Sequence, residues 1–295
     1  MTDSVSIIIC TANRAELLRR CLESLRQVAF PADRSFELVV VDNASRDDTK
    51  AVCEAFVAGA PLPTRYVFEP KRGKSHALNS GIAAATGDIL YFTDDDCVFV
   101  ERFAADLRRE FADPALDGIG GRVELYDPTD LPITTRLYDE RIAFTDAAWL
   151  FYLIPGCNMA FRRRVFERIG GFDPLLGPGT PRVAEDSDFL YRALQAGCRM
   201  VYTPGLLIYH GHGRKEPADA VKIRRAYAIG RGAFYMKHLL ARDRTVLRMV
   251  AWEVAGLLRL VFRTLRRGPF DREALACLFR LLRGATSYAA ARVGA

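Results

Sequence analysis

The sequence predicts an α/β protein with a doubly wound, mainly parallel β-sheet. Two observations in residues 1–100 support this fold: β-branched apolar runs alternate with segments of helical periodicity, and polar residues follow each apolar run. Strands interleaved with helices predict right-handed crossovers and a sheet that is covered on both faces. Half of the 295 residues are apolar, which is enough for a substantial core.

The elements of this first half follow one another in a regular order. Apolar, β-branched runs predict four strands, at residues 5–10, 36–41, 65–69 and 88–93. Helical spacing between these runs predicts three helices, at residues 14–28, 47–59 and 74–86. Ligands of such sheets bind beyond the carboxyl ends of the strands, so the residues just after each strand are the candidates for chemistry.

The alternation of strands and helices loosens beyond residue 115. A strand-like run covers residues 117–126, and a Gly/Pro loop at residues 175–184 precedes a helix that begins with the acidic pair Glu185 and Asp186. We expect a mixed half here, with loops that form an acceptor pocket. The predicted organisation is one α/β domain over residues 1–213 and a helical C-terminal region over residues 214–295.

The C-terminal region carries the basic charge of the chain. Residues 214–295 hold 18 Lys/Arg against 6 Asp/Glu, which leaves 24 against 30 in residues 1–213. Apolar residues recur there at helical spacing: Leu247, Val250, Val254, Leu257, Leu258, Val261, Phe262 and Leu265. Arginines fall on the opposite face: Arg248, Arg259, Arg263 and Arg266. This pattern predicts an amphipathic basic helix.

A second, less clearly divided helix is expected at residues 273–291, after a Gly-Pro-Phe break at residues 268–270. Three interpretations of the basic helices stay open: they pack on the α/β domain, form a homodimer, or dock on an anionic membrane surface. Aromatic residues are too sparse for a nucleic-acid surface, and no nucleic-acid-binding module is recognisable, so nucleic acid is not an expected partner.

The cysteines and the hydropathy pattern bear on the expected location. Seven cysteines lack CxxC spacing and lie within apolar or helical patterns, as reduced buried thiols do. We find no signal peptide and no apolar run long enough to span a bilayer. The expected location is therefore the cytoplasm, with attachment to the inner face of the cell membrane as the peripheral alternative.

Polar side chains follow each predicted strand. They are Thr11, Asn13 and Arg14 after the first, Asp42 and Asn43 after the second, Arg72 to Lys74 after the third, and Asp94, Asp95 and Asp96 after the fourth. No GxGxxG follows the first strand, and no GxxxxGK[ST] occurs anywhere in the chain. These absences argue against dinucleotide-dependent hydride transfer and P-loop phosphate transfer.

Three consecutive aspartates, Asp94 to Asp96, interrupt the fourth apolar run. They follow a strand that should end at Thr93, so alternate side chains can point the same way. Adjacent carboxylates repel one another, and a divalent cation such as Mg²⁺ or Mn²⁺ would relieve the repulsion. The alternative is a solvated acidic turn or a helix cap.

Eight motifs, in the order in which they occur along the chain, resemble those of the inverting family 2 glycosyltransferases, which have the GT-A fold. The resemblance covers roughly residues 4–213 and rests on IIICTANR, VVVDNAS, RGKSHALNSGI, ILYFTDDDC, GCNMAFRR, GGFDP, EDSDFLYR and TPGLLIYH. Several motifs in a fixed order are far more specific than any one of them.

The resemblance implies a metal site made of Asp94, Asp96 and His210, with Mn²⁺ or Mg²⁺ as the cofactor. His210 follows an extended apolar run and could instead make an ordinary hydrogen bond, and His212 could share its face. The residues implied to bind the nucleotide-sugar are Thr11, Asn13, Arg14, Asp42, Arg72, Lys74, Asp94 and Asp95.

Within this set the expected roles differ. Asp42 would recognise the nucleobase, and Asp95 would lie near the ribose. Arg72 and Lys74 flank a helix entrance at Gly73, where free N–H groups favour a diphosphate. Asp42 could equally form a turn that caps the next helix, and Arg14 could be an exposed first-turn residue.

Asp186 is implied to be the catalytic base, and Glu185 is implied to help place the acceptor. Acidic residues in the first turn of a helix also stabilise that helix, so a purely structural role is the alternative. Asp188 is expected to stabilise the helix.

The predicted function is a metal-dependent, inverting transfer of a sugar from a nucleoside-diphosphate sugar to a hydroxyl of a glycan or lipid-linked acceptor. A UDP-sugar is expected in preference to a GDP- or dTDP-sugar. The expected context is polysaccharide biosynthesis for the cell envelope. A metal-dependent nucleotidyltransferase or phosphohydrolase, and a non-enzymatic scaffold, are the alternatives.

Overall fold

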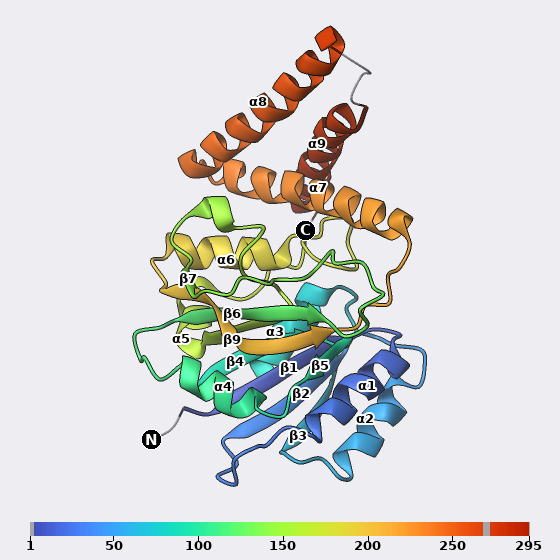
Figure 1. Cartoon of the computed structure of the whole chain (residues 1–295), viewed down its shortest axis with the longest axis vertical. Coiled ribbons are helices and arrows are strands. Elements are labelled where there is room, and N and C mark those ends of the chain that lie inside the picture. The colour runs from blue at the N-terminus through green and yellow to red at the C-terminus, as the bar shows by residue number, and fades with distance from the viewer. Residues whose placement is uncertain (1–2, 268–271, 295) are drawn as a thin grey trace. The chain divides into compact units, whose positions relative to one another are not determined.

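The computed structural model describes residues 3–267 and 272–294 (Figure 1). The chain forms two compact units. We call Met1–Phe172 together with Phe189–Lys215 the sheet unit, and Asp173–Asp188 together with Glu216–Ala295 the helical unit.

The sheet unit is built on a nine-stranded sheet in which eight strands follow the order β3-β2-β1-β4-β8-β6-β9-β5, and β7 pairs with β9. The strands are β1 (Val5–Thr11), β2 (Phe36–Asp42), β3 (Thr64–Phe68), β4 (Ile89–Asp94), β5 (Cys97–Phe99), β6 (Gly118–Leu125), β7 (Ile142–Ala143), β8 (Asn158–Arg162) and β9 (Met200–His210). All seven residues of β1 are buried, as expected for a strand with neighbours on both sides and helices on both faces.

Strands β1 to β4 confirm the predicted parallel half. β1 pairs in parallel with β2 and β4, and β2 pairs in parallel with β3. Thr11 lies opposite Asp42 across the first pair, and Cys10 lies opposite Asp94 across the second, so the carboxyl ends of three strands are level. This register places the polar residues that follow the strands along one edge.

The remaining strands form the mixed half that the sequence predicts. β8 is antiparallel to both β4 and β6, whereas β6 and β9 are parallel. β5 runs antiparallel to the end of β9, with Cys97 opposite His210. This pairing brings the end of β9 beside the aspartates that precede β5.

The helices that accompany the sheet are α1 (Ala15–Leu25), α2 (Thr49–Val57), α3 (Lys74–Ala84), α4 (Phe103–Glu110) and α5 (Arg163–Ile169), with a short 3₁₀ helix at Ala147–Trp149. The helical unit contains α7 (Pro217–Leu240), α8 (Arg244–Arg267) and α9 (Arg272–Val293). Helix α6 (Glu185–Gln195) begins in the helical unit and ends in the sheet unit. All seven cysteines are free thiols.

Helix α8 buries only part of the apolar stripe that the sequence predicts for it. Val261 is buried, whereas Leu247 and Phe262 are exposed. The side chains of Leu265 and Arg266, and the break at residues 268–270, lie outside the described residues. Within the described part of the chain, none of the helices is long and apolar enough to cross a membrane.

Candidate active site

The three aspartates lie at the point where β4 gives way to a turn. β4 extends to Asp94, one residue beyond the predicted end, and Asp95 and Asp96 form the turn that leads into β5. Asp95 and Asp96 are buried, and Asp94 is partly exposed. The predicted alternation along a strand is wrong here, because the chain leaves the strand geometry after Asp94.

Basic side chains from two helix starts neutralise the aspartates. Arg14, directly before α1, places Nη1 2.8 Å from Oδ1 of Asp95 and Nη2 2.5 Å from Oδ2 of Asp96. Lys74, the first residue of α3, places Nζ 2.5 Å from Oδ1 of Asp94. Each carboxylate therefore has a cationic partner within the chain, which offsets the repulsion among them.

The two buried aspartates titrate in opposite directions. Burial raises the pKa of Asp95 to about 7 against the opposing charge of Arg14, while the neighbouring Asp96 charge adds to the rise. Burial also acts to raise the pKa of Asp96, but the hydrogen bond and charge of His210, together with Arg14, hold that pKa well below its usual range. Asp96 is thus the anionic centre of the cluster at neutral pH.

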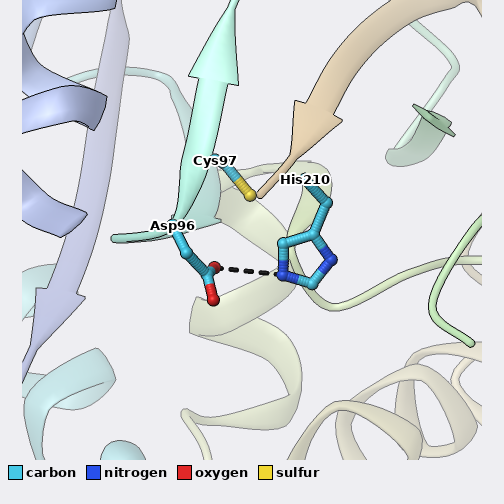
Figure 2. Close-up of side chains that lie close together, drawn as sticks. All are labelled: Asp96, Cys97 and His210. Atoms are coloured by element: carbon cyan, nitrogen blue, oxygen red, sulfur yellow. Dashed lines mark hydrogen bonds and ion pairs between the residues drawn. The ribbon is translucent and has the colours of Figure 1, made fainter. Parts of the chain in front are cut away.

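His210 ends β9 and faces the Asp96 carboxylate (Figure 2). Its Nε2 lies 3.0 Å from Oδ1 of Asp96, and its Nδ1 lies 2.8 Å from Oγ1 of Thr134. Burial acts to lower the pKa of His210, whereas Cys157 and the hydrogen-bonded Asp96 raise it to about 9. A cation that binds Nε2 would have to displace a proton from the ring.

Asp96, Cys97 and His210 offer potential metal-binding atoms that all lie within 4.8 Å of one another. The thiol of Cys97 is buried in the apolar core and lies 3.9 Å from the carbonyl oxygen of Cys157. Burial raises the pKa of Cys97 well above its ordinary value, so the group is a neutral thiol. Carboxylate oxygen suits Mn²⁺ and Mg²⁺, and a neutral imidazole nitrogen suits Mn²⁺, better than a thiol does, so Asp96 fits either cation and His210 fits Mn²⁺.

Asp42 and Thr11 occupy the neighbouring strand ends. Asp42 is buried, and its carboxylate accepts hydrogen bonds from the Tyr66 hydroxyl at 2.8 Å and the Ser45 amide at 2.9 Å. The Ser45 contact forms a turn of the kind that the sequence offered as the alternative role of Asp42. The hydroxyl of Thr11 donates to Oδ2 of Asp95 at 2.7 Å, which connects the first strand to the aspartate cluster.

The loops after β1 and β2 are tied to each other. The amide of Asn13, a residue with positive φ, donates to Oγ of Ser45 at 2.9 Å, and its side-chain oxygen accepts from the Arg46 amide at 2.8 Å. Arg72 is exposed and its Nη2 lies 3.5 Å from the Ala44 carbonyl oxygen. The sequence-predicted residues Asn13 and Arg72 thus border the cluster without contacting an aspartate in it.

Glu185 and Asp186 begin helix α6, as the sequence predicts, and belong to the helical unit. Glu185 is buried, and Asp186 is partly exposed. Oδ1 of Asp186 accepts a hydrogen bond from the Ser187 amide at 2.6 Å. Asp188, two residues after Asp186, is fully buried and pairs with Lys237 and His238 of α7.

Sequence reasoning missed several side chains that shape the site. Thr134 orients His210 and Tyr66 holds Asp42, whereas Asn43, which the sequence places after the second strand, accepts from the Gly73 amide at 2.7 Å at the start of α3. Neither Thr134 nor Tyr66 belongs to a motif, and their partners His210 and Asp42 lie 76 and 24 residues away in the chain. His212 contacts the Leu131 carbonyl at 3.1 Å and Asp130 at 3.5 Å, so its partners differ from those of His210.

Comparisons with known families match most of the chain. The family described as "Glycosyl transferase family 2" matches residues 6–170, and "Glycosyl transferase family group 2" matches residues 89–291. The chain is 27% identical over 225 residues to the "Uncharacterized glycosyltransferase alr2836" of Nostoc sp., which covers 73% of this chain and 67% of that protein.

Two solved structures share the fold. Mannosyltransferase PcManGT from Pyrobaculum calidifontis, in complex with GDP-Man and Mn²⁺, aligns with a TM-score of 0.58 and 23% identity over 100% of this chain and 76% of that chain. TarS 1-349 of S. aureus, in complex with UDP-GlcNAc, aligns with a TM-score of 0.61 and 17% identity over 99% of this chain and 92% of that chain. Both likenesses concern the fold, which is that of GT-A glycosyltransferases.

Proposed function

Since the chain belongs to glycosyltransferase family 2 and is a glycosyltransferase, we propose that it transfers a sugar from a nucleoside-diphosphate sugar with inversion at the anomeric carbon. One observation carries the proposal: Asp94, Asp95 and Asp96, with His210, lie at the carboxyl ends of parallel strands. That edge is where open α/β sheets bind nucleotides.

The donor is proposed to lie across the ends of β1, β2 and β4. Asp42 would accept hydrogen bonds from the nucleobase, Asp95 would meet the ribose, and Lys74 would meet the diphosphate, while Thr11 would contact the base or a phosphate. Asn13, Arg14 and Arg72 would line the same edge. The solved neighbours bind GDP-Man and UDP-GlcNAc, so a nucleotide-sugar is supported and a UDP-sugar remains our proposal.

Asp94, Asp96 and His210 are proposed to hold Mn²⁺ or Mg²⁺. Such a cation, when bound, would stabilise the negative charge that develops on the departing diphosphate. The chain's own cations act in the same direction: Lys74 lies beside Asp94, and Arg14 spans Asp95 and Asp96. Arg14 would have to release Oδ2 of Asp96 if the cation uses that oxygen.

Asp186 is proposed to accept the proton of the attacking acceptor hydroxyl, and Glu185 to help place the acceptor. A single displacement from the opposite face inverts the anomeric centre and requires no covalent intermediate on the protein. The partly exposed carboxylate of Asp186 is compatible with this role, because a general base must reach a substrate.

The release products test the reaction class. We expect incubation with Mn²⁺ and a set of UDP- and GDP-sugars, with membrane lipid extract as the acceptor source, to release the nucleoside diphosphate and transfer the sugar. A nucleotidyltransferase would instead transfer the nucleoside monophosphate and release the sugar 1-phosphate, and a phosphohydrolase would cleave the donor with water to the nucleoside monophosphate and the sugar 1-phosphate. Either of those outcomes, in place of sugar transfer, would contradict the proposal.

The acceptor is proposed to be a lipid-linked or other glycan of the cell envelope, reached from an anionic membrane surface. Helix α8 supports this proposal because Trp252 is 77% exposed and Phe262 60% exposed on a face that also carries arginines. Exposed aromatic and aliphatic side chains beside arginines are typical of interfacial helices.

Vesicle binding tests this surface. We expect the protein to sediment with phosphatidylglycerol vesicles but not with phosphatidylcholine vesicles, and replacement of Arg248, Arg259 and Arg263 by glutamine to reduce the bound fraction severalfold. The matched control replaces three exposed basic residues of the sheet unit, Arg19, Lys50 and Arg199, by glutamine and should bind like the parent. Undiminished binding by the α8 variant, or a concentration-dependent dimer without lipid binding, would refute membrane docking.

A further inference from the structure

The segment that carries Glu185 and Asp186 belongs to the helical unit rather than to the sheet unit. Residues Asp173–Asp188 group with the C-terminal helices, whereas the chain on either side of the segment groups with the sheet. The segment includes the predicted Gly/Pro loop, in which Gly177 and Gly179 have positive φ. Its course therefore depends on contacts within the helical unit.

Buried charges fix the end of the segment next to Asp186. Asp188 is fully buried, and its carboxylate oxygens lie 2.8 Å from Nζ of Lys237 and 3.0 Å from Nε2 of His238. Both partners lie in the last turns of α7. A buried carboxylate with two cationic or hydrogen-bonding partners resists displacement, because separating them would leave a charge unpaired.

The same lysine fixes the other end of the segment. Nζ of Lys237 lies 2.9 Å from Oδ2 of Asp173, and the Tyr288 hydroxyl of α9 donates to the same oxygen at 2.8 Å. Burial acts to raise the pKa of Asp173, but the Lys237 charge and these hydrogen bonds lower it, so the carboxylate is anionic. One ammonium group thus connects residues 173 and 188.

The middle of the segment packs on the same helices. Nη1 of Arg182 donates to Oγ of Ser287 at 2.7 Å, and its Nε donates to the Leu175 carbonyl at 2.7 Å. Gly230 of α7 lies so close that a Cβ there would be 1.9 Å from the carbonyl oxygen of Val183. Helix α7 therefore contacts the segment with both its backbone and its charged side chains.

We propose that Lys237, assisted by His238 and Tyr288, is a positioning residue that fixes the segment and hence the direction of the Asp186 carboxylate. This inference rests on the proposed function of Asp186. A general base must lie within hydrogen-bond reach of its proton, and a misplacement of about 1 Å costs about 10²-fold in rate. The C-terminal helices are then part of the catalytic machinery, in addition to any role at a membrane.

A matched control exists within the same helical unit. Glu253 of α8 lies 3.0 Å from Nη2 of Arg231 and accepts a hydrogen bond from the Tyr235 hydroxyl. This group of three connects α7 with α8 through contacts that do not involve Lys237. Replacing Glu253 by glutamine perturbs the helical unit without releasing the segment, so it separates general destabilisation from positioning.

The test compares Lys237→Met, Tyr288→Phe and Glu253→Gln, with the nucleoside diphosphate released from the donor sugar as the turnover assay. We expect the turnover number to fall about 10- to 100-fold in Lys237→Met and severalfold in Tyr288→Phe, and to stay at the parental value in Glu253→Gln. Calorimetric affinity for UDP or GDP with Mn²⁺ should be unchanged in all three, and Lys237→Arg should recover part of the loss.

Hydrogen–deuterium exchange of residues 173–188 should rise in Lys237→Met and Tyr288→Phe only. If Lys237→Met does not fold, Tyr288→Phe decides the question, because it removes a single hydroxyl. A turnover number in Tyr288→Phe and Lys237→Met equal to that of Glu253→Gln would overturn the inference. Asp186→Asn separates the two claims, since an active Asp186→Asn would refute the proposed base itself.

Discussion

Asp186→Asn is expected to lower the turnover number about 10²- to 10⁴-fold while leaving nucleotide affinity at the parental value. The amide keeps the shape of the side chain and can still accept a hydrogen bond from the Ser187 amide, but it cannot accept a proton. The turnover number and the calorimetric affinity for UDP or GDP, measured on the same preparation, check this prediction.

The competing explanation of Asp186 is a structural one, in which the acid stabilises the start of α6. Such an interaction contributes about 0.3–1 kcal/mol, too little to abolish activity in a folded protein. Asp219→Asn is the matched control, because Asp219 is the acid in the first turn of α7. We expect both variants to unfold at similar temperatures but only Asp186→Asn to lose turnover. Parental turnover in Asp186→Asn would exclude this residue as the base.

Asp96→Asn is expected to lower turnover on the order of 10²- to 10³-fold and to abolish the effect of Mn²⁺ on nucleotide binding. Asp96 is the buried anion between Arg14 and His210, so its charge is the one that a cation at this position would require. Loss of that charge also removes a hydrogen-bonded partner that favours protonated His210. Turnover at saturating Mn²⁺ and nucleotide affinity with and without Mn²⁺ provide the measurement.

Asp127→Asn is the control for this second prediction. Asp127 is an acid of the sheet unit that pairs with Lys215 at 2.7 Å. We expect this variant to retain turnover and its response to Mn²⁺. If Asp96→Asn behaves like Asp127→Asn, the aspartate cluster serves only to stabilise the turn between β4 and β5.

The parallel half of the fold could be predicted because each of its strands is an uninterrupted apolar run. The predicted strands at residues 5–10 and 36–41 correspond to β1 and β2, each of which extends one residue further, to Thr11 and Asp42. Burial on both faces requires such runs, and their ends are marked by polar residues. The edge of the sheet that carries the candidate site was predictable for the same reason.

The partners of the aspartates were not predictable, because they depend on long-range packing. Arg14 lies 82 residues from Asp96 in sequence, and His210 lies 114 residues from it. No periodicity indicates that Arg14 should span Asp95 and Asp96, or that Lys74 should meet Asp94. The grouping of Asp173–Asp188 with the C-terminal helices has the same origin, since Lys237 and Tyr288 lie more than 40 residues further along the chain.

The exposed face of α8 shows a different limit of sequence patterns. Helical periodicity groups Leu247, Val261 and Phe262 on one side of the helix, but it does not show how wide the buried contact is. In the structure Val261 is buried, while Leu247 and Phe262 are exposed. The width of a buried stripe is set by the neighbouring helices, which the pattern of a single helix does not contain.

Calorimetric titration of the parent protein with UDP and with GDP, each with and without Mn²⁺ or Mg²⁺, tests the central claim most directly. If a cation at Asp96 and His210 holds the donor diphosphate, one of these nucleotides should bind at least tenfold more tightly with the metal than without it. This ratio corresponds to a difference of about 1.4 kcal/mol in binding free energy. Binding that is equally tight without metal, or no uptake of nucleotide under any of these conditions, would contradict the account.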